Sequence, residues 1–288
     1  MLQYDFMQNA FAATFIVACV AGTIGYFMVL RGQTFAGHAM SHVGFAGATG
    51  AVLLGASPLL GLTLFTVAAG LGIGLLGDRA QGRDVAIGIV LSLSLGLGLL
   101  FLHFYTAFAG QATTLLFGNI LGVGRSTLWF MVAIGLVALL VLGAIARPLI
   151  FCSLQPELAE AKGVSPRVIG TVFMVTVSLA VAESVQVVGI LLVFTLMVAP
   201  AATAMHLSSK VTTAVALSVL LALGEAWIGL VLAFYTDWPA SFWITLLGAA
   251  CYLMAWGLSR QPSFHGSKVA ADSGVGAHAP HRETLLRR

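Results

Sequence analysis

The stretch "STLWFMVAIGLVALLVLGAIA", from Ser126 to Ala146, contains no aspartate, glutamate, lysine or arginine. Roughly 20 apolar residues are enough for an α-helix to cross the hydrocarbon core of a bilayer. The whole chain follows this pattern, since 59% of its 288 residues are hydrophobic and only 8% are charged. Soluble domains carry about 25% charged residues. The sequence therefore predicts an all-α polytopic membrane protein.

Charged residues separate the apolar runs, and these runs predict eight or nine transmembrane helices. The runs at 167–182 and 185–206 are short, with a turn expected near Glu183, and a broken or re-entrant pair there would leave eight crossings. The expected helices span about 10–30, 36–56, 58–77, 85–104, 126–146, 167–182, 185–206, 212–235 and 239–258.

Lysine and arginine are concentrated in alternate loops of this arrangement. The residues concerned are Arg31, Arg79, Arg83, Arg147, Lys162, Arg167, Lys210, Arg260 and the basic tail. Because cytoplasmic loops carry the excess of cationic residues, we expect these loops and the C-terminus to be cytoplasmic, with Arg125 as the exception. Residues 1–259 are the expected transmembrane domain. Residues 260–288 lack apolar periodicity and predict a disordered, histidine-containing cytoplasmic tail.

Two segments do not fit simple membrane spans. The loop "RPLIFCSLQPELAEAKGVSPR" (147–167) predicts a short amphipathic helix that begins at Pro156 and ends near Gly163. The segment 105–124 is apolar but interrupted by glycine, which predicts an interfacial or re-entrant helix on the outer side.

Few ionisable groups lie inside the expected spans, and such groups are functional candidates because burying them in a bilayer is costly. His38 and His42 share one helix face at i and i+4, and imidazole suits zinc and other transition metals. The alternative is a pair hydrogen-bonded to the backbone or to Ser41. Glu225 is either a hydrogen-bonded packing residue or a cation contact.

Three further ionisable residues are expected near the ends of spans. We expect Glu183 at the solvated outer interface, and His103 and His206 at the interfaces rather than in a metal site.

Several classes of function are excluded by missing motifs. A metalloprotease of the HExxH type needs a glutamate after its first histidine, and here Ala39 follows His38. No GxxxxGK[ST] phosphate loop occurs, so the chain is not itself an ATPase of that kind. The net charge of +3 comes largely from the tail and short loops, which gives no indication of nucleic-acid binding.

The chain resembles the permease subunits of bacterial ABC importers for zinc, manganese and iron. Three stretches carry the resemblance: "LRGQTFAGHAMSHVGFAGATGAVLLG" (30–55), "GRDVAIGIVLSLSLGLGLLFLH" (82–103) leading to "LLFGNILGV" (115–123), and "VQVVGILLVFTLMVAPAATA" (185–204). The resemblance implies a type II ABC importer-like bundle in the bacterial inner membrane, working as a homodimer or pseudo-dimer.

The resemblance also implies partners and a coupling segment. Separate ABC ATPase subunits would bind ATP, and a periplasmic or lipid-anchored metal-binding protein would deliver the ion, with no cofactor held stably by this chain. The coupling segment is about 153–166, and Gln155 stands where the family usually has aspartate. The residues it assigns to coupling are Pro156, Glu157, Leu158, Ala159, Glu160 and Gly163.

One departure from the family pattern bears on the transported metal. The family has an aspartate four residues before a histidine, and here His38 occupies the aspartate position while His42 is kept. Replacing carboxylate by imidazole favours zinc over manganese, with manganese or iron as the other cations. The alternative function is a secondary cation transporter driven by a proton or sodium gradient, with Glu225 as its coupling carboxylate.

Overall fold

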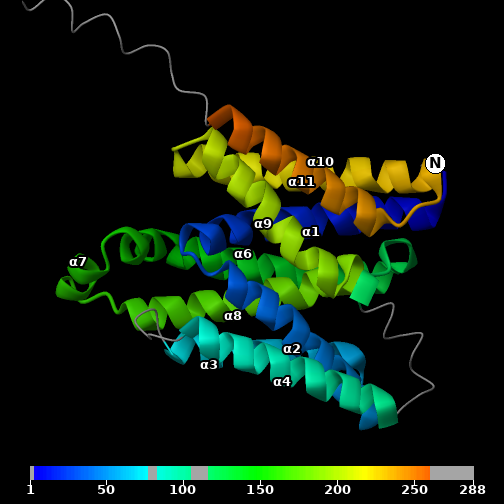
Figure 1. Cartoon of the computed structure of the whole chain (residues 1–288), viewed down its shortest axis with the longest axis horizontal. Helices are drawn as coiled ribbons and strands as arrows, with labels where there is room; N and C mark the ends of the chain where they lie inside the picture. The colour runs from blue at the N-terminus through cyan, green and yellow to red at the C-terminus, as the bar shows by residue number, and fades with distance from the viewer. Residues whose placement is uncertain (1–2, 77–82, 105–115, 260–288) are drawn as a thin grey trace, which may run out of the picture.

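The computed structural model describes residues 3–76, 83–104 and 116–259, and these residues form a helical bundle without β-strands (Figure 1). The predicted all-α fold is confirmed. The long helices are α1 (Asp5–Leu30), α2 (Thr34–Leu53), α3 (Pro58–Leu76), α4 (Arg83–Phe104), α6 (Arg125–Leu154), α8 (Pro166–Val188), α9 (Ile190–Leu207), α10 (Val211–Thr236) and α11 (Ala240–Ser259). Two short elements, η2 (Ile120–Gly122) and α7 (Pro156–Ala161), complete the described part.

Eight of these helices are long and apolar enough to cross a membrane. Helix α2 is not among the eight, although it has 20 residues. Its two histidines lower its hydropathy, and α2 is the helix in which we placed the candidate metal ligands. The described residues thus contain the nine long helices expected from the apolar runs, whereas most of the expected outer-side helix at 105–124 and the expected tail at 260–288 lie outside the described residues.

The expected turn near Glu183 is wrong. Helix α8 continues through Glu183 to Val188, and the chain reverses at Gly189, which has φ +80°. A Cβ on Gly189 would overlap with the backbone of Phe117 and Gly118, and Gly118 itself has φ +81°. The break between α8 and α9 therefore depends on two glycines in left-handed backbone conformation whose main chains touch.

Two arginines at helix ends make long-range hydrogen bonds. Arg31 at the end of α1 donates from Nη1 to Ser153 Oγ at the end of α6 (3.1 Å). Arg167 at the start of α8 donates from Nη2 to the carbonyl oxygen of Leu75 at the end of α3 (2.7 Å). We name this end of the bundle, which also holds α7, the cationic end; the N-terminus and the turn from α10 to α11 lie at the opposite end (Figure 1).

Helix α1 runs through the middle of the bundle and packs on α6, α8, α9 and α10. Ser218 on α10 donates to the carbonyl oxygen of Gly22 (2.7 Å), so the two backbones approach closely. A Cβ on Gly25 would overlap with the carbonyl group of Met197 on α9. Small residues permit such close contact between membrane helices, where van der Waals packing drives association.

We expect Gly25→Ala to destabilise the protein by at least about 1–3 kcal/mol, as for other overpacked interiors. The reason is that the new methyl group meets the Met197 backbone, which cannot change rotamer. The measurement is the thermal unfolding midpoint of the purified protein in detergent. Gly72→Ala is the control, since a Cβ there has no atom within 4 Å. Equal unfolding midpoints for the two variants would contradict this, since they would show that α1 and α9 can move apart to accommodate the methyl group without loss of stability.

Candidate functional site

The two histidines of α2 lie against each other. Their ring centroids are 4.8 Å apart with an interplanar angle of 80°, as the i, i+4 spacing predicts. His42 is 9% exposed, and His38 is half-buried. Among the described residues, neither Nδ1 atom has a hydrogen-bond partner. Within the described residues, each ring therefore keeps a nitrogen without a hydrogen-bond partner, and histidine nitrogens bind zinc at about 2.0–2.1 Å.

Ser41, which we considered as a partner for the histidines, bonds elsewhere. Its hydroxyl donates to the carbonyl oxygen of Gly37 (3.3 Å), one turn earlier in α2. The preceding residue, Met40, is fully buried, and its Sδ accepts a hydrogen bond from Ser178 on α8 (3.4 Å). The contact between Met40 and Ser178 joins α2 to α8, and neither hydrogen bond involves the histidine rings.

Helix α9 supplies an aromatic wall for the histidine pair. The ring centroid of Phe194 lies 4.9 Å from that of His38, with an interplanar angle of 66°. The sequence did not point to Phe194, because it is an aromatic residue in an apolar run and its contact with α2 depends on how two distant helices pack. The histidine pair is thus placed where α2 meets α9.

Glu225 does not complete the histidine pair. It is 3% exposed on α10, and a Cβ on Gly248 of α11 would lie 3.1 Å from its Oε2. Within the described ranges, no group of three histidine, cysteine or acidic residues is arranged to hold a metal. Among the described histidine, cysteine and acidic residues, the pair therefore stands without a third metal ligand.

Glu183 is buried, which corrects our expectation of a solvated interface. Its exposed fraction is 0%, because α8 extends beyond it and packs on α1 and α6. A Cβ on Gly135 of α6 would lie 3.3 Å from Glu183 Oε2 and 2.9 Å from Val20 Cγ2 of α1. In the part of the chain that the structure describes, neither carboxyl oxygen has a hydrogen-bond partner.

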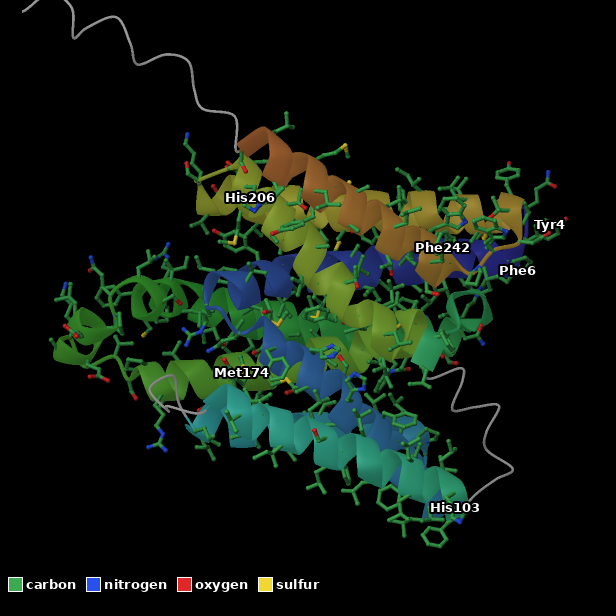
Figure 2. The ribbon with its side chains drawn as sticks, in the orientation of Figure 1. Tyr4, Phe6, His103, Met174, His206 and Phe242 are labelled. Carbon is green, nitrogen blue, oxygen red and sulfur yellow. The ribbon has the colours of Figure 1, made fainter. Side chains whose placement is uncertain are left out.

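His103 and His206 lie near helix ends, as expected, and both are exposed (Figure 2). The ring of His206 lies 5.7 Å from that of Tyr252 on α11, and His206 belongs to no group of three possible metal ligands among the described residues. The structure gives neither residue a place in the histidine pair of α2.

The predicted amphipathic helix of the 147–167 loop is present as α7. Pro156 is its first residue, and Gly163, with φ +81°, follows it in left-handed conformation. Ala159 is fully buried, whereas Leu158 is 45% exposed and Glu157 is exposed. Gln155 makes no side-chain capping bond. The helix is therefore fixed by one face to α6 and α8 and presents the other at the cationic end.

Comparison with known proteins gives consistent matches along the chain. The sequence pattern described as "ABC 3 transport family" matches residues 3–258. The chain is 30% identical over 256 residues to "Manganese transport system membrane protein MntC" of Halalkalibacterium halodurans, covering 88% of each chain. It is 30% identical over 270 residues to "Manganese import system permease protein ScaB" of Streptococcus gordonii, covering 92% of this chain and 96% of that one.

A solved structure shares the fold. "PsaBC from Streptococcus pneumoniae in complex with Fab" matches with a TM-score of 0.79 and 27% identity, covering 88% of this chain and 92% of that one. The helical arrangement described above is therefore also found in a solved structure.

The burial of Glu183 leads to a prediction about stability. A buried polar group without a partner costs about 1–3 kcal/mol, so Glu183→Met, which keeps a similar volume, is expected to raise the thermal unfolding midpoint. Glu157→Met on the exposed face of α7 is the matched control, with little change expected. A lower midpoint for Glu183→Met would show that the carboxyl group makes a net favourable interaction in the bundle.

Proposed function

The chain belongs to the ABC 3 transport family, and we propose that it carries zinc, as its preferred divalent ion, through the bacterial inner membrane. In this proposal it is the membrane subunit of an ATP-driven importer. The relatives named as manganese transport proteins align over almost their full length, which supports metal import and disfavours a secondary transporter. The chain lacks a phosphate loop, so ATP would be hydrolysed by separate ATPase subunits.

The observation that carries the proposal is the histidine pair of α2. Two imidazoles, each with a ring nitrogen free of protein partners, form half of a tetrahedral zinc shell. A second copy of the chain in a homodimer would supply the other two donors. An incomplete shell in each copy suits a transported ion, because the ion must bind well enough to enter and weakly enough to leave.

Zinc is favoured over manganese by the donor atoms. Manganese prefers carboxylate and carbonyl oxygen, whereas imidazole suits zinc. The pair contains no carboxylate, and the two buried glutamates that the structure describes, Glu183 and Glu225, lie outside it. Selectivity for zinc therefore rests on His38, at the position where the family usually has aspartate.

The two ends of the bundle have different partners in this proposal. Cytoplasmic surfaces of membrane proteins carry the excess of lysine and arginine, so the cationic end, with α7, faces the cytoplasm and the ATPase subunits. The C-terminus follows α11 on that side. The opposite end receives the ion from a metal-binding protein outside the membrane.

A continuous path of packed helices connects α7 with the histidines. Helix α7 lies between α6 and α8, α8 crosses the bundle to Gly189, and α9 then returns with Phe194 against His38. A displacement of α7 by the ATPase would reach the histidine pair through these elements. The mechanism thus requires that α8 and α9 change their relative angle at Gly189.

The first test replaces His42. We expect His42→Ala to reduce zinc uptake to background in proteoliposomes that hold the full assembly, because one imidazole cannot retain the ion. His206→Ala is the control, since this exposed histidine lies outside the pair, and its uptake should match the unmodified protein. Both variants must be present at equal amounts and with equal unfolding midpoints.

The same assay tests the choice of metal. His38→Asp restores the aspartate–histidine pattern of the family and is expected to shift competition between zinc and manganese towards manganese. Normal zinc uptake by His42→Ala would remove the histidine site from the proposal. An unchanged metal preference in His38→Asp would remove the argument for zinc while leaving metal import intact.

The second test concerns α7. Leu158→Glu places charge on the exposed apolar residue of this helix and is expected to weaken ATPase binding by more than about tenfold, as removal of a central apolar contact does. Pull-down of the ATPase subunit and ATP-driven uptake are measured. Leu207→Glu, also at an exposed leucine at the cationic end, is the control. Equal loss in both variants would argue against a specific role for α7.

A further inference from the structure

A groove of about 640 Å³ opens at the end of the bundle opposite α7. The start of α1, the short helix η2, the end of α10 and the start of α11 form its walls. Phe6, Leu121, Leu230 and Phe234 make the lining apolar, and Asp237 is the one charged residue among the lining residues that the structure describes. Its volume is in the range of about 300–1,000 Å³ that is typical of small-molecule sites.

Aromatic side chains surround the mouth of this groove. Trp238 stacks on Trp243 with ring centroids 5.5 Å apart and an interplanar angle of 15°, and Tyr4 stacks on Phe6 at 5.4 Å. Figure 2 shows Tyr4, Phe6 and Phe242 at the same end of the molecule. Tryptophan and tyrosine are enriched where a membrane meets water. The groove therefore opens at the depth of lipid headgroups, with its apolar walls continuing into the hydrocarbon.

Asp237 is held at the rim of the groove by the backbone. It terminates α10 in left-handed conformation (φ 56°), and its N–H donates to the carbonyl oxygen of Ala233 (3.1 Å). The residue is exposed. Its carboxylate thus lies where an apolar groove meets water, and a ligand that matches this arrangement has an apolar chain and a cationic hydrogen-bond donor at one end.

We propose that this groove binds one phosphatidylethanolamine molecule, with an acyl chain along the apolar walls and the ammonium group on the Asp237 carboxylate. A choline headgroup is cationic but has no N–H to donate. An anionic headgroup is repelled by Asp237 and by Asp5, which begins α1 beside Phe6. A lipid fits better than a soluble protein segment because three of the four walls belong to α1, α10 and α11, which are helices of membrane-spanning length. The site is independent of the transported metal.

The test is native mass spectrometry of the full-length chain in mild detergent, with added phosphatidylethanolamine, phosphatidylcholine or phosphatidylglycerol of identical acyl chains. We expect one bound phosphatidylethanolamine per chain, held about fivefold more tightly than phosphatidylcholine, the size expected for one hydrogen bond, and more tightly than phosphatidylglycerol, whose headgroup carries no cation. Asp237→Asn should abolish this preference while retaining the left-handed backbone, which asparagine also tolerates. Asp5→Asn is the charge control and should keep the preference for phosphatidylethanolamine over phosphatidylcholine.

A second variant tests the groove itself. Ala233→Phe fills the groove and is expected to reduce retention of all three lipids, whereas Ala133→Phe on the exposed face of α6 should not. Equal retention of the three lipids by the unmodified protein would overturn the proposal. It would also be overturned if Ala233→Phe left lipid binding unchanged but disrupted the dimer or the binding of the metal-binding protein, since the groove would then be a protein interface.

Discussion

Every backbone amide inside a bilayer must find its hydrogen-bond partner within the protein, because the hydrocarbon offers none. This constraint produces the helices of the bundle and determines what each side chain can do. Serine and threonine hydroxyls largely bond to carbonyl groups of their own helix, as Thr14, Thr49 and Thr176 do with the residue one turn earlier. Against this background, the buried side chains of the described residues that lack a partner stand out: the histidine pair of α2, the two buried glutamates and Ser184.

Much of the fold was predictable because charge marks the places where the chain leaves the membrane. The apolar runs predicted the nine long helices, with most ends within three residues, and the isolated polar loop predicted α7. The end of α6 at Leu154 and the end of α8 at Val188 lie further along the chain than expected. The rule that charged residues mark the ends of spans failed at Glu183. We expected a turn there, but Glu183 lies inside α8. The true break at Gly189 was missed because it depends on contact with Gly118, and a contact between residues so distant in sequence leaves no local pattern.

The candidate site shows the same division between local and long-range information. The neighbouring histidine rings follow from helical spacing alone, so the sequence predicted their contact. Phe194 was not predicted, because its position against His38 requires the packing angle of α2 on α9. Glu225 was considered as a metal contact since it is acidic and lies in a membrane span, but it packs against α9 and α11, away from the pair. The presence of an ionisable side chain in a membrane span therefore does not show whether the residue belongs to the histidine site or is buried elsewhere in the bundle.

The contact between Gly118 and Gly189 has a consequence for how the sequence can change over time. A side chain at Gly189 is obstructed by the main chain at Gly118, and a side chain at Gly118 by the main chain at Val188 and Gly189. Since every amino acid has this main chain, no substitution at one position can make room for a side chain at the other. Second-site suppressors of a mutation at either glycine must therefore move whole segments of backbone, which makes this joint one of the least replaceable parts of the chain.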